Sequence, residues 1–240
     1  MKESEFPKKF ILSRDSKYFI SRTCGGYSKY TNMRGKSLLP NCTGGAYGIS
    51  MQICETTDYK KVTLPKAHAG AWYNNCKWEK GKEPRLGAVI CWKKHGTTDG
   101  SGHVGIVTGL ERDRQGNVTK VTKVLESSYY SYNKKDWREG MPYKYDKKTG
   151  AIIKSGYDFQ GYLYNPNVEL DKPEPFKVGD KVKIIARGNS RPDGKGKACN
   201  GISWKRYVIE IKEGAKFPYK VGFLDGRTTG WYKEEALEEA

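Results

Sequence analysis

The sequence predicts an α+β N-terminal part, with helices packed on an antiparallel sheet, followed by a small all-β part. Three observations support this prediction. A cysteine followed by small residues marks the start of a buried helix near residue 42. Runs rich in β-branched residues from residue 84 onward indicate neighbouring strands, and short strand-like runs separated by turns fill residues 176–240.

The first helix is predicted to begin at or just after Cys42. Pro40 and Asn41 favour a chain reversal directly before it, and residues 46–52 are mostly small or apolar. A thiol at this position lies at the positive end of the helix dipole, which favours the thiolate. The alternative is a buried structural thiol, because the chain has six cysteines and free cysteine is often buried. A second helix is predicted over residues 66–80.

Three strands are predicted after the helices, at residues 84–92, 102–107 and 118–126. Gly116 and Asn117 supply a hairpin turn between the last two strands. His103 opens the middle strand and Glu126 ends the next, so the hairpin can bring the carboxylate to one ring nitrogen of the histidine. The other ring nitrogen then faces a sulfur on the packed helix. This is the arrangement of a nucleophile, a base and an orienting acid.

Few other residues compete for these roles. Besides the histidine that opens the middle strand, the chain has only His68 and His95, which are interpreted as surface or packing residues. Asp136 and Glu139 follow the third strand and are alternatives to Glu126 as the acid. A lone histidine on a buried strand can also be a hydrogen-bonded core residue without any chemistry, and this alternative stays open.

The net charge of +17 suits a polyanionic partner: nucleic acid, an anionic membrane surface, or the teichoic acids and carboxylates of a bacterial wall. No long apolar run is present, so membrane insertion is not expected. Residues 1–6 are charged, which is unlike a secretory signal, and synthesis in a cytosol is the expectation. Residues 24–41 contain no acidic side chain and the cysteines show no metal-ligand spacing, so neither a metal nor another cofactor is expected.

Four segments in the same order resemble one known family: Asn41-Cys42 with its helix, residues 84–92, residues 102–107, and Leu125-Glu126 with the serines and tyrosine that follow. They are similar to the motifs of the CHAP domain, the cysteine, histidine-dependent amidohydrolase/peptidase. Residues 159–166 resemble its closing strand, so the resemblance covers roughly residues 10–166.

This resemblance implies a papain-like fold and cysteine-dependent hydrolysis of an amide in peptidoglycan. Cys42 is then the nucleophile, His103 the base and Glu126 the acid. Two positions depart from the family pattern: Ala88 stands where an acidic residue is common, and Ser128 where some members have an asparagine. Some members also bind calcium through an acidic loop before the cysteine, which this chain lacks.

Residues 166–175 are rich in proline and acidic residues and are predicted to be a linker. The expected domains are therefore 1–165, catalytic, and 176–240. The second domain resembles a bacterial SH3-like wall-binding barrel, through Val178-Gly179-Asp180, a central tryptophan, and Gly230-Trp231-Tyr232. The candidate wall contacts are Trp204, Tyr207, Tyr219, Trp231 and Tyr232. Core packing is the alternative role for each of these side chains.

Together the two resemblances imply a phage-type endolysin, an amidase (N-acetylmuramoyl-L-alanine amidase) or endopeptidase. Such an enzyme is made in the host cytoplasm and, after release, acts on peptidoglycan and associated anionic polymers. No nucleic-acid motif appears, so nucleic acid is not the expected partner. Two other classes stay open as alternatives: a basic nucleic-acid-binding protein and a catalytically inactive wall-binding protein. The former is favoured by the net charge and by a cluster of tyrosines that could stack on bases, namely Tyr129, Tyr130, Tyr132, Tyr143 and Tyr145. The bond cleaved, the host and the oligomeric state are not predicted.

Overall fold

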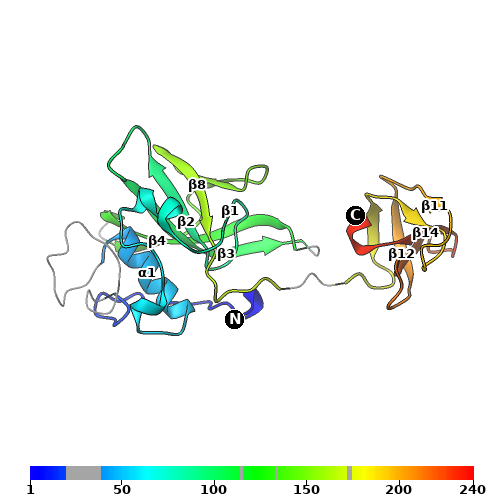
Figure 1. Cartoon of the computed structure of the whole chain (residues 1–240), viewed down its shortest axis with the longest axis horizontal. Coiled ribbons are helices and arrows are strands. Elements are labelled where there is room, and N and C mark those ends of the chain that lie inside the picture. Colours follow the sequence, from blue (N-terminus) through cyan, green and yellow to red (C-terminus); the bar gives the residue numbers. More distant parts are fainter. Residues whose placement is uncertain (20–38, 114–115, 133–134, 172–174) are drawn as a thin grey trace. The chain divides into compact units, whose positions relative to one another are not determined.

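The computed structural model describes residues 1–19, 39–113, 116–132, 135–171 and 175–240, and side chains outside 129–135 (Figure 1). The chain divides into two compact units. The first consists of Met1–Arg112 and Val118–Asp171, and the second of Asp113–Asn117 and Lys172–Ala240. The finer domain boundaries at residues 165 and 175 stay a prediction.

The first unit is built on a six-stranded antiparallel sheet that curves into a half-barrel, with the strand order β1-β8-β2-β3-β4-β5. Its strands are β1 (Lys80–Gly81), β2 (Val89–Lys94), β3 (Gly102–Arg112), β4 (Val118–Tyr132), β5 (Lys135–Gly140) and β8 (Tyr157–Leu163). A separate ribbon pairs β6 (Lys144–Asp146) with β7 (Ala151–Ile153). The three strands predicted from the sequence correspond to β2, β3 and β4.

The helix α1 (Cys42–Ile53) lies across one face of this sheet (Figure 1) and begins at the predicted residue. Asn41 caps it, because its side-chain oxygen accepts a hydrogen bond from the Gly44 N–H at 2.9 Å. Gly45 allows the helix to approach the sheet closely. A Cβ atom added at Gly45 would lie 2.9 Å from the Cβ of Ser127 on β4.

The predicted papain-like α+β architecture, with a layer of N-terminal helices on the sheet, was wrong. The described residues are mostly β-structure, with two short α-helices, α1 and α2 (Trp72–Asn75). Within 66–80, where a long second helix was expected, α2 follows the 3₁₀ turn Ala69–Ala71. The backbone there bonds elsewhere: the Gly70 N–H donates to the Gly100 carbonyl at 2.9 Å. Glycine and asparagine are also weak helix formers, so local propensity does not oppose this loop contact.

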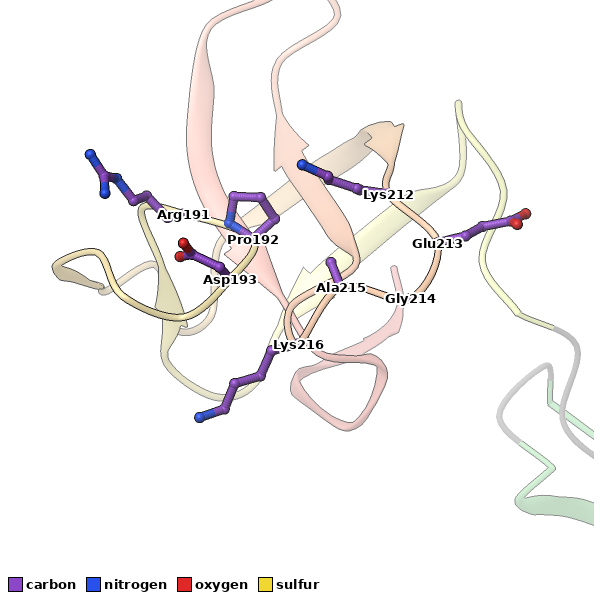
Figure 2. A pocket seen from close by; sticks show the side chains of 8 residues that line it. All are labelled: Arg191, Pro192, Asp193, Lys212, Glu213, Gly214, Ala215 and Lys216. Atoms are coloured by element: carbon purple, nitrogen blue, oxygen red, sulfur yellow. The ribbon is translucent and has the colours of Figure 1, made fainter.

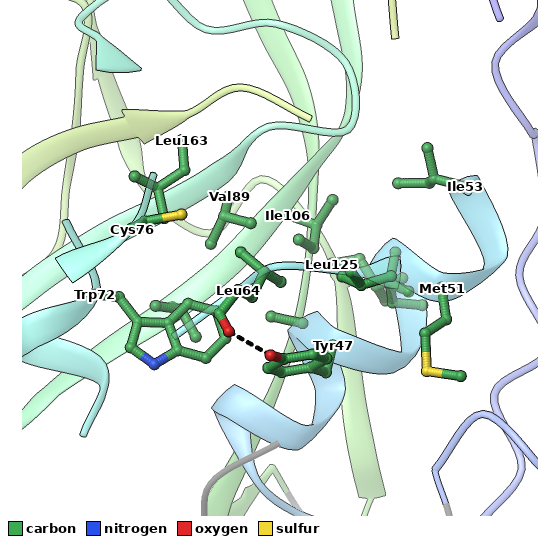
Figure 3. Close-up of a cluster of buried hydrophobic side chains, with 14 of the residues drawn as sticks. Tyr47, Met51, Ile53, Leu64, Trp72, Cys76, Val89, Ile106, Leu125 and Leu163 are labelled. Carbon is green, nitrogen blue, oxygen red and sulfur yellow. Dashed lines mark hydrogen bonds between the residues drawn. The ribbon is translucent and has the colours of Figure 1, made fainter. Parts of the chain in front are cut away.

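The strands of the half-barrel bury both faces. On the α1 face, Val89, Ile106 and Leu125 pack with Tyr47 and Trp72, as Figure 3 shows. The opposite face has its own core, which includes Trp92, Val107, Val124 and Tyr162. Alternate residues of one strand therefore serve two cores, as the two-residue period of a strand requires. The placement of His103 and Glu126, next to Val104 and Leu125, follows from this alternation.

The second unit is all-β, with the strand order β11-β10-β14-β13-β12-β9-β15. Its strands are β9 (Lys181–Ile184), β10 (Gly188–Asn189), β11 (Ala198–Cys199), β12 (Lys205–Ile211), β13 (Tyr219–Gly222), β14 (Thr228–Tyr232) and β15 (Leu237–Glu239). The short strands expected over residues 176–240 are therefore present, with β9, β12, β13 and β14 the longest of them. The core contains Val182, Val208, Val221 and Tyr232, among others.

The chain directly after β8 is held by the N-terminus. The Glu169 N–H donates to the Met1 carbonyl and the Glu3 N–H donates to the Glu169 carbonyl, each at 2.9 Å. The Ser4 N–H donates to the Asp171 carboxylate at 2.8 Å. The first part of the proline- and acid-rich segment therefore packs on the first unit, while residues 172–174 lie outside the described part. Among the described helices, none has the length and apolar character of a membrane span.

Candidate active site

Cys42 is the first residue of α1, and its side chain is partly buried at the point where the helix meets the sheet. The Asn41 N–H, one residue earlier, donates to the Ser127 hydroxyl on β4 at 3.0 Å. The helix start is thus fixed to the strand that carries Glu126. The Cys42 sulfur forms a side-chain hydrogen bond with His103.

His103 and Glu126 meet on the sheet. The Nε2 atom of His103 lies 2.6 Å from Oε2 of Glu126, and the side chains are 6% and 0% exposed. Since Nε2 is engaged by the carboxylate, Nδ1 is the ring nitrogen that remains for the thiol. The predicted order of cysteine, histidine and acid is therefore one continuous chain of hydrogen bonds.

The electrostatics of the three groups favour an ion pair. Burial opposes the Cys42 thiolate, but the hydrogen bond and charge of His103, with backbone bonds at Val104 and Thr43, outweigh it and lower the thiol pKa. Burial likewise opposes the His103 imidazolium, but Cys42 and Glu126 outweigh it and raise the histidine pKa. Burial is also outweighed at Glu126, where His103, Tyr143 and Lys154 lower the pKa to about 2.

The other described cysteines differ from Cys42 in this respect. Burial raises the pKa of each of their thiols, at Cys54, Cys76, Cys91 and Cys199. Cys24 lies outside the described residues. Among the described thiols, Cys42 alone has its pKa lowered, and a lowered pKa is what a nucleophilic cysteine needs.

The ring of His103 is fixed by its neighbours on the sheet. It stacks on Trp92 at 5.7 Å between ring centroids and 27° between planes, and the Tyr157 ring lies 6.3 Å away. Gly105 leaves the space that this arrangement needs. A Cβ atom added there would lie 3.1 Å from Val124 and 3.5 Å from both Glu126 and Trp92. The tight contact is the one with Val124, so a side chain at position 105 would press on this core residue while touching the acid and the tryptophan at ordinary contact distance.

These observations can be set beside known proteins. Residues 31–124 match the CHAP domain. CHAP domains are cysteine/histidine-dependent amidohydrolases or peptidases, and both Cys42 and His103 fall within the match. No curated protein matches the chain. A solved structure titled "The crystal structure of Ly7917" aligns at 10% sequence identity and a TM-score of 0.28, over 86% of this chain and 90% of that one.

The first unit is called the CHAP unit below, because the matched residues 31–124 lie almost entirely within it. The other histidines and acids considered for the site lie elsewhere in this unit. His95 is exposed and pairs with Asp158 at 3.0 Å, and His68 is partly buried before the 3₁₀ turn Ala69–Ala71. Asp136 accepts from the Arg14 guanidinium. Glu139 lies 3.9 Å from Lys123. Among the described residues, Glu126 is the acid that bonds directly to His103.

Three residues that the sequence reasoning missed complete the surroundings of the acid. Arg138 on β5 donates from Nε to Oε1 of Glu126 at 2.8 Å, and the Tyr143 hydroxyl donates to the same oxygen at 2.7 Å. Lys154 donates to the Tyr143 hydroxyl at 2.6 Å. Arg138 lies opposite Glu126 in the β4–β5 register. Residues 135–140 read Lys-Asp-Trp-Arg-Glu-Gly, which has no apolar alternation, so the sequence offered no local signal for it.

The proposed wall contacts of the second unit differ widely in exposure. Trp204 is 50% exposed, whereas Trp231 is 8%, Tyr219 is 5% and Tyr232 is 0% exposed. Tyr207 is intermediate. Tyr219 and Tyr232 belong to the core of the unit. Trp204 is therefore the candidate whose ring is most available to a ligand.

Two other kinds of candidate site are a pocket in the second unit and a metal-binding cluster. A hollow of the second unit, drawn in Figure 2, lies between the turns at residues 191–193 and 212–216 and is lined by charged side chains of both signs. Within the described part of the chain, no cluster of three or more His, Cys, Asp or Glu side chains could hold a metal ion. Residues 24–41, which contain no acidic side chain, lie mostly outside that part. The expectation that the chain binds no metal therefore stays a prediction.

Proposed function

We propose that this chain is a peptidoglycan hydrolase of the phage-endolysin type, in which Cys42, His103 and Glu126 hydrolyse an amide bond of the bacterial wall. The observation that supports it is the continuous hydrogen-bonded order of thiol, imidazole and carboxylate within a CHAP-matched unit. The second unit would bind the wall, a role that rests on its sequence resemblance and on the exposed Trp204 ring.

The reaction is acyl transfer through the sulfur. The Cys42 thiolate attacks the amide carbonyl carbon, and the C–O π electrons move to the oxygen. When the intermediate collapses, the C–N bond breaks and the His103 imidazolium protonates the departing amine. A water molecule, deprotonated by His103, then attacks the thioester, and the C–S bond breaks to release a carboxylic acid and restore the Cys42 thiolate beside the His103 imidazolium. Each proton removed is returned, so no other reagent is needed.

Glu126 and the helix start support this cycle. The carboxylate holds Nε2 of His103, so that Nδ1 faces the sulfur while the imidazolium forms and is consumed. Cys42 is the first residue of α1, and the N–H groups of a first helical turn have no acceptor within the helix. The Cys42 N–H would therefore stabilise the oxyanion of the intermediate.

Purified walls test the chemistry. Digestion by the full chain should release new amino termini, and labelling and identifying them distinguishes an amidase, which frees the first stem-peptide residue from the glycan, from an endopeptidase. The same digestion with Cys42→Ala is the control. Absence of any new amine with the unmodified chain would exclude wall amide hydrolysis.

The endolysin role needs a separate test. The chain should be harmless when produced alone in host cells and should lyse them once their membrane is permeabilised, because its substrate lies outside the membrane. Lysis without permeabilisation would contradict this role. Retention on immobilised nucleic acid that salt abolishes, without any wall hydrolysis, would instead favour the nucleic-acid alternative.

A further inference from the structure

The carboxylate of Glu126 is held at both oxygens. Oε2 bonds to Nε2 of His103 at 2.6 Å and accepts from the Tyr143 hydroxyl at 2.9 Å. Oε1 accepts from Tyr143 at 2.7 Å and from the Nε and Nη2 atoms of Arg138, with 2.8 Å for Nε. A carboxylate with a fully buried side chain needs such donors, because burial of an unpaired charge is costly.

The Tyr143 hydroxyl donates its proton to the Glu126 carboxylate. The ammonium group of Lys154 donates to the Tyr143 oxygen at 2.6 Å, and Nη2 of Arg138 also donates to it. Lysine and arginine have no acceptor, so the tyrosine oxygen must accept from both. Its own proton is then directed to Glu126.

We propose that Arg138 and Tyr143 are positioning residues for the acid, and that Lys154 sets the direction in which Tyr143 donates. This inference rests on the proposed function, because it takes Cys42, His103 and Glu126 as the reacting set. Arg138 and Tyr143 stop the carboxylate from rotating, so Oε2 stays on Nε2 and Nδ1 stays on the sulfur.

The charge of Arg138 predicts a distinctive pH effect. The described titratable and charged groups that face His103 and Glu126 are Cys42 from α1, Arg138 from β5, Tyr143 before β6, Lys154 after β7 and Tyr157 from β8. An anion beside His103 raises its proton affinity, and a cation lowers it. Removing Arg138 should therefore raise the affinity of His103 for its proton, whereas removing the Glu126 charge should lower it.

The alkylation of Cys42 tests this without a wall substrate. The full chain is treated with iodoacetamide over about pH 5 to about pH 10, a range that spans the ordinary His and Cys values. The rate is read by mass spectrometry on the peptide that contains Cys42. The variants are Arg138→Met, Arg138→Lys, Tyr143→Phe and Glu126→Gln. Arg85→Met is the matched control, because that arginine stacks on Tyr164 at 3.6 Å and pairs with Glu79.

The pH of the upper inflection of the alkylation-rate profile should move in opposite directions in the Glu126 and Arg138 variants. Glu126→Gln should lower it and Arg138→Met should raise it, each by about half to one pH unit. Arg138→Lys keeps the charge, so its inflection should lie close to that of the unmodified chain. Tyr143→Phe should raise it less and should reduce kcat for wall hydrolysis about tenfold at unchanged KM, because a bond to a charged group is lost. Arg85→Met should match the unmodified chain.

Two results would overturn the inference. One is an unshifted profile and unchanged kcat in both Arg138→Met and Tyr143→Phe. The other is a shift of Arg138→Met in the same direction as Glu126→Gln. If Arg138→Met fails to fold, Tyr143→Phe decides, since it removes a single oxygen. A failure of the proposed function looks different: the unmodified chain leaves walls intact while its Cys42 still reacts at low pH with the predicted variant shifts.

Discussion

The two units differ in what they bury. In the CHAP unit the side chains of His103 and Glu126 are almost fully buried and hydrogen-bonded to each other. Among the described residues of the second unit, the buried polar or charged set consists of Asn189 alone, and the core is aliphatic and aromatic. Charge is costly to bury, so its presence in one unit and its absence from the described core of the other make the first unit the candidate for chemistry and leave the second as the candidate for binding at its surface.

Burial of charge alone does not identify a site, however. Glu3 is also buried in the CHAP unit, where it accepts from Arg112 at 2.8 Å and from the Leu86 N–H at 3.0 Å. That pair ties the N-terminus to the sheet and contacts no nucleophile. The candidate site differs because its carboxylate is linked through a histidine to a thiol whose pKa is lowered.

The largest expected effect comes from the thiol itself. Cys42→Ala should reduce wall hydrolysis by about a thousandfold or more, because no other group can form the thioester. Binding of the full chain to walls should be unchanged, since it is assigned to the second unit. Turbidity loss and pelleting with walls measure the two properties. Cys54→Ala should keep full activity, and an active Cys42→Ala chain would exclude this nucleophile.

The next effect concerns the acid. Glu126→Gln should reduce the maximal rate by about tenfold to a hundredfold, because the imidazole loses its orienting charge. The carboxylate raises the His103 pKa, so its removal should also move the alkaline limit of activity to lower pH. A rate profile against pH measures both. Asp136→Asn is the control, and if it alone altered the profile, the third role would belong to Asp136.

The sequence was sufficient for this site where local patterns decide the structure. Pro40 and Asn41 mark the helix start at Cys42, and the strand alternation places His103 on β3. The hairpin then brings Glu126 to it, as predicted. Each of these steps depends on neighbours in sequence or on one turn, which a single chain can reveal.

The features that the sequence did not predict depend on contacts between segments that are distant in the chain. The expected helix over residues 66–80 is shortened because the backbone of Gly70 bonds to a loop thirty residues away. Arg138, Tyr143 and Lys154 converge on Glu126 from β5 and from the ends of a small ribbon. No local period encodes that convergence, and tertiary contacts override propensity at such positions.

A smaller expected effect is a difference between the two units in how much stability each loses at acid pH. The Glu126 pKa is lowered from its ordinary 4.5 to about 2. A depressed carboxyl contributes stability above its unfolded value, and that stability is lost as the pH falls through the folded value. The free energy of unfolding of the CHAP unit should therefore fall by ~3 kcal/mol between about pH 4.5 and about pH 2.

Calorimetry of the full chain at a series of acid pH values measures this difference. The transition of the second unit should shift much less, because its buried residues carry no such group. In Glu126→Gln the transition of the CHAP unit should start lower and depend less on pH, which also assigns it. Equal shifts of both transitions would contradict the contrast between the two units.

The smallest effect tests the second unit as a binding surface. Trp204 is half exposed, and Arg206 lies between its ring and that of Phe223, with the guanidinium 4.8 Å and 4.1 Å from the two centroids. This stack orders the tryptophan at the surface, where an aromatic face can pack on a glycan or peptide. Trp204→Ala should weaken wall binding about fivefold, the loss of roughly 1 kcal/mol, without unfolding the unit.

The measurement uses the Cys42→Ala chain, so that hydrolysis does not remove the ligand, and compares the bound fraction across a range of wall concentrations. Val178→Ala is the control, because Val178 is 61% exposed and contributes an apolar side chain without the stack. Unchanged binding in Trp204→Ala would remove the proposed contact. If binding then persisted in the CHAP unit after the second unit was deleted, targeting would belong to the CHAP unit, and the division of roles between the two units would be wrong.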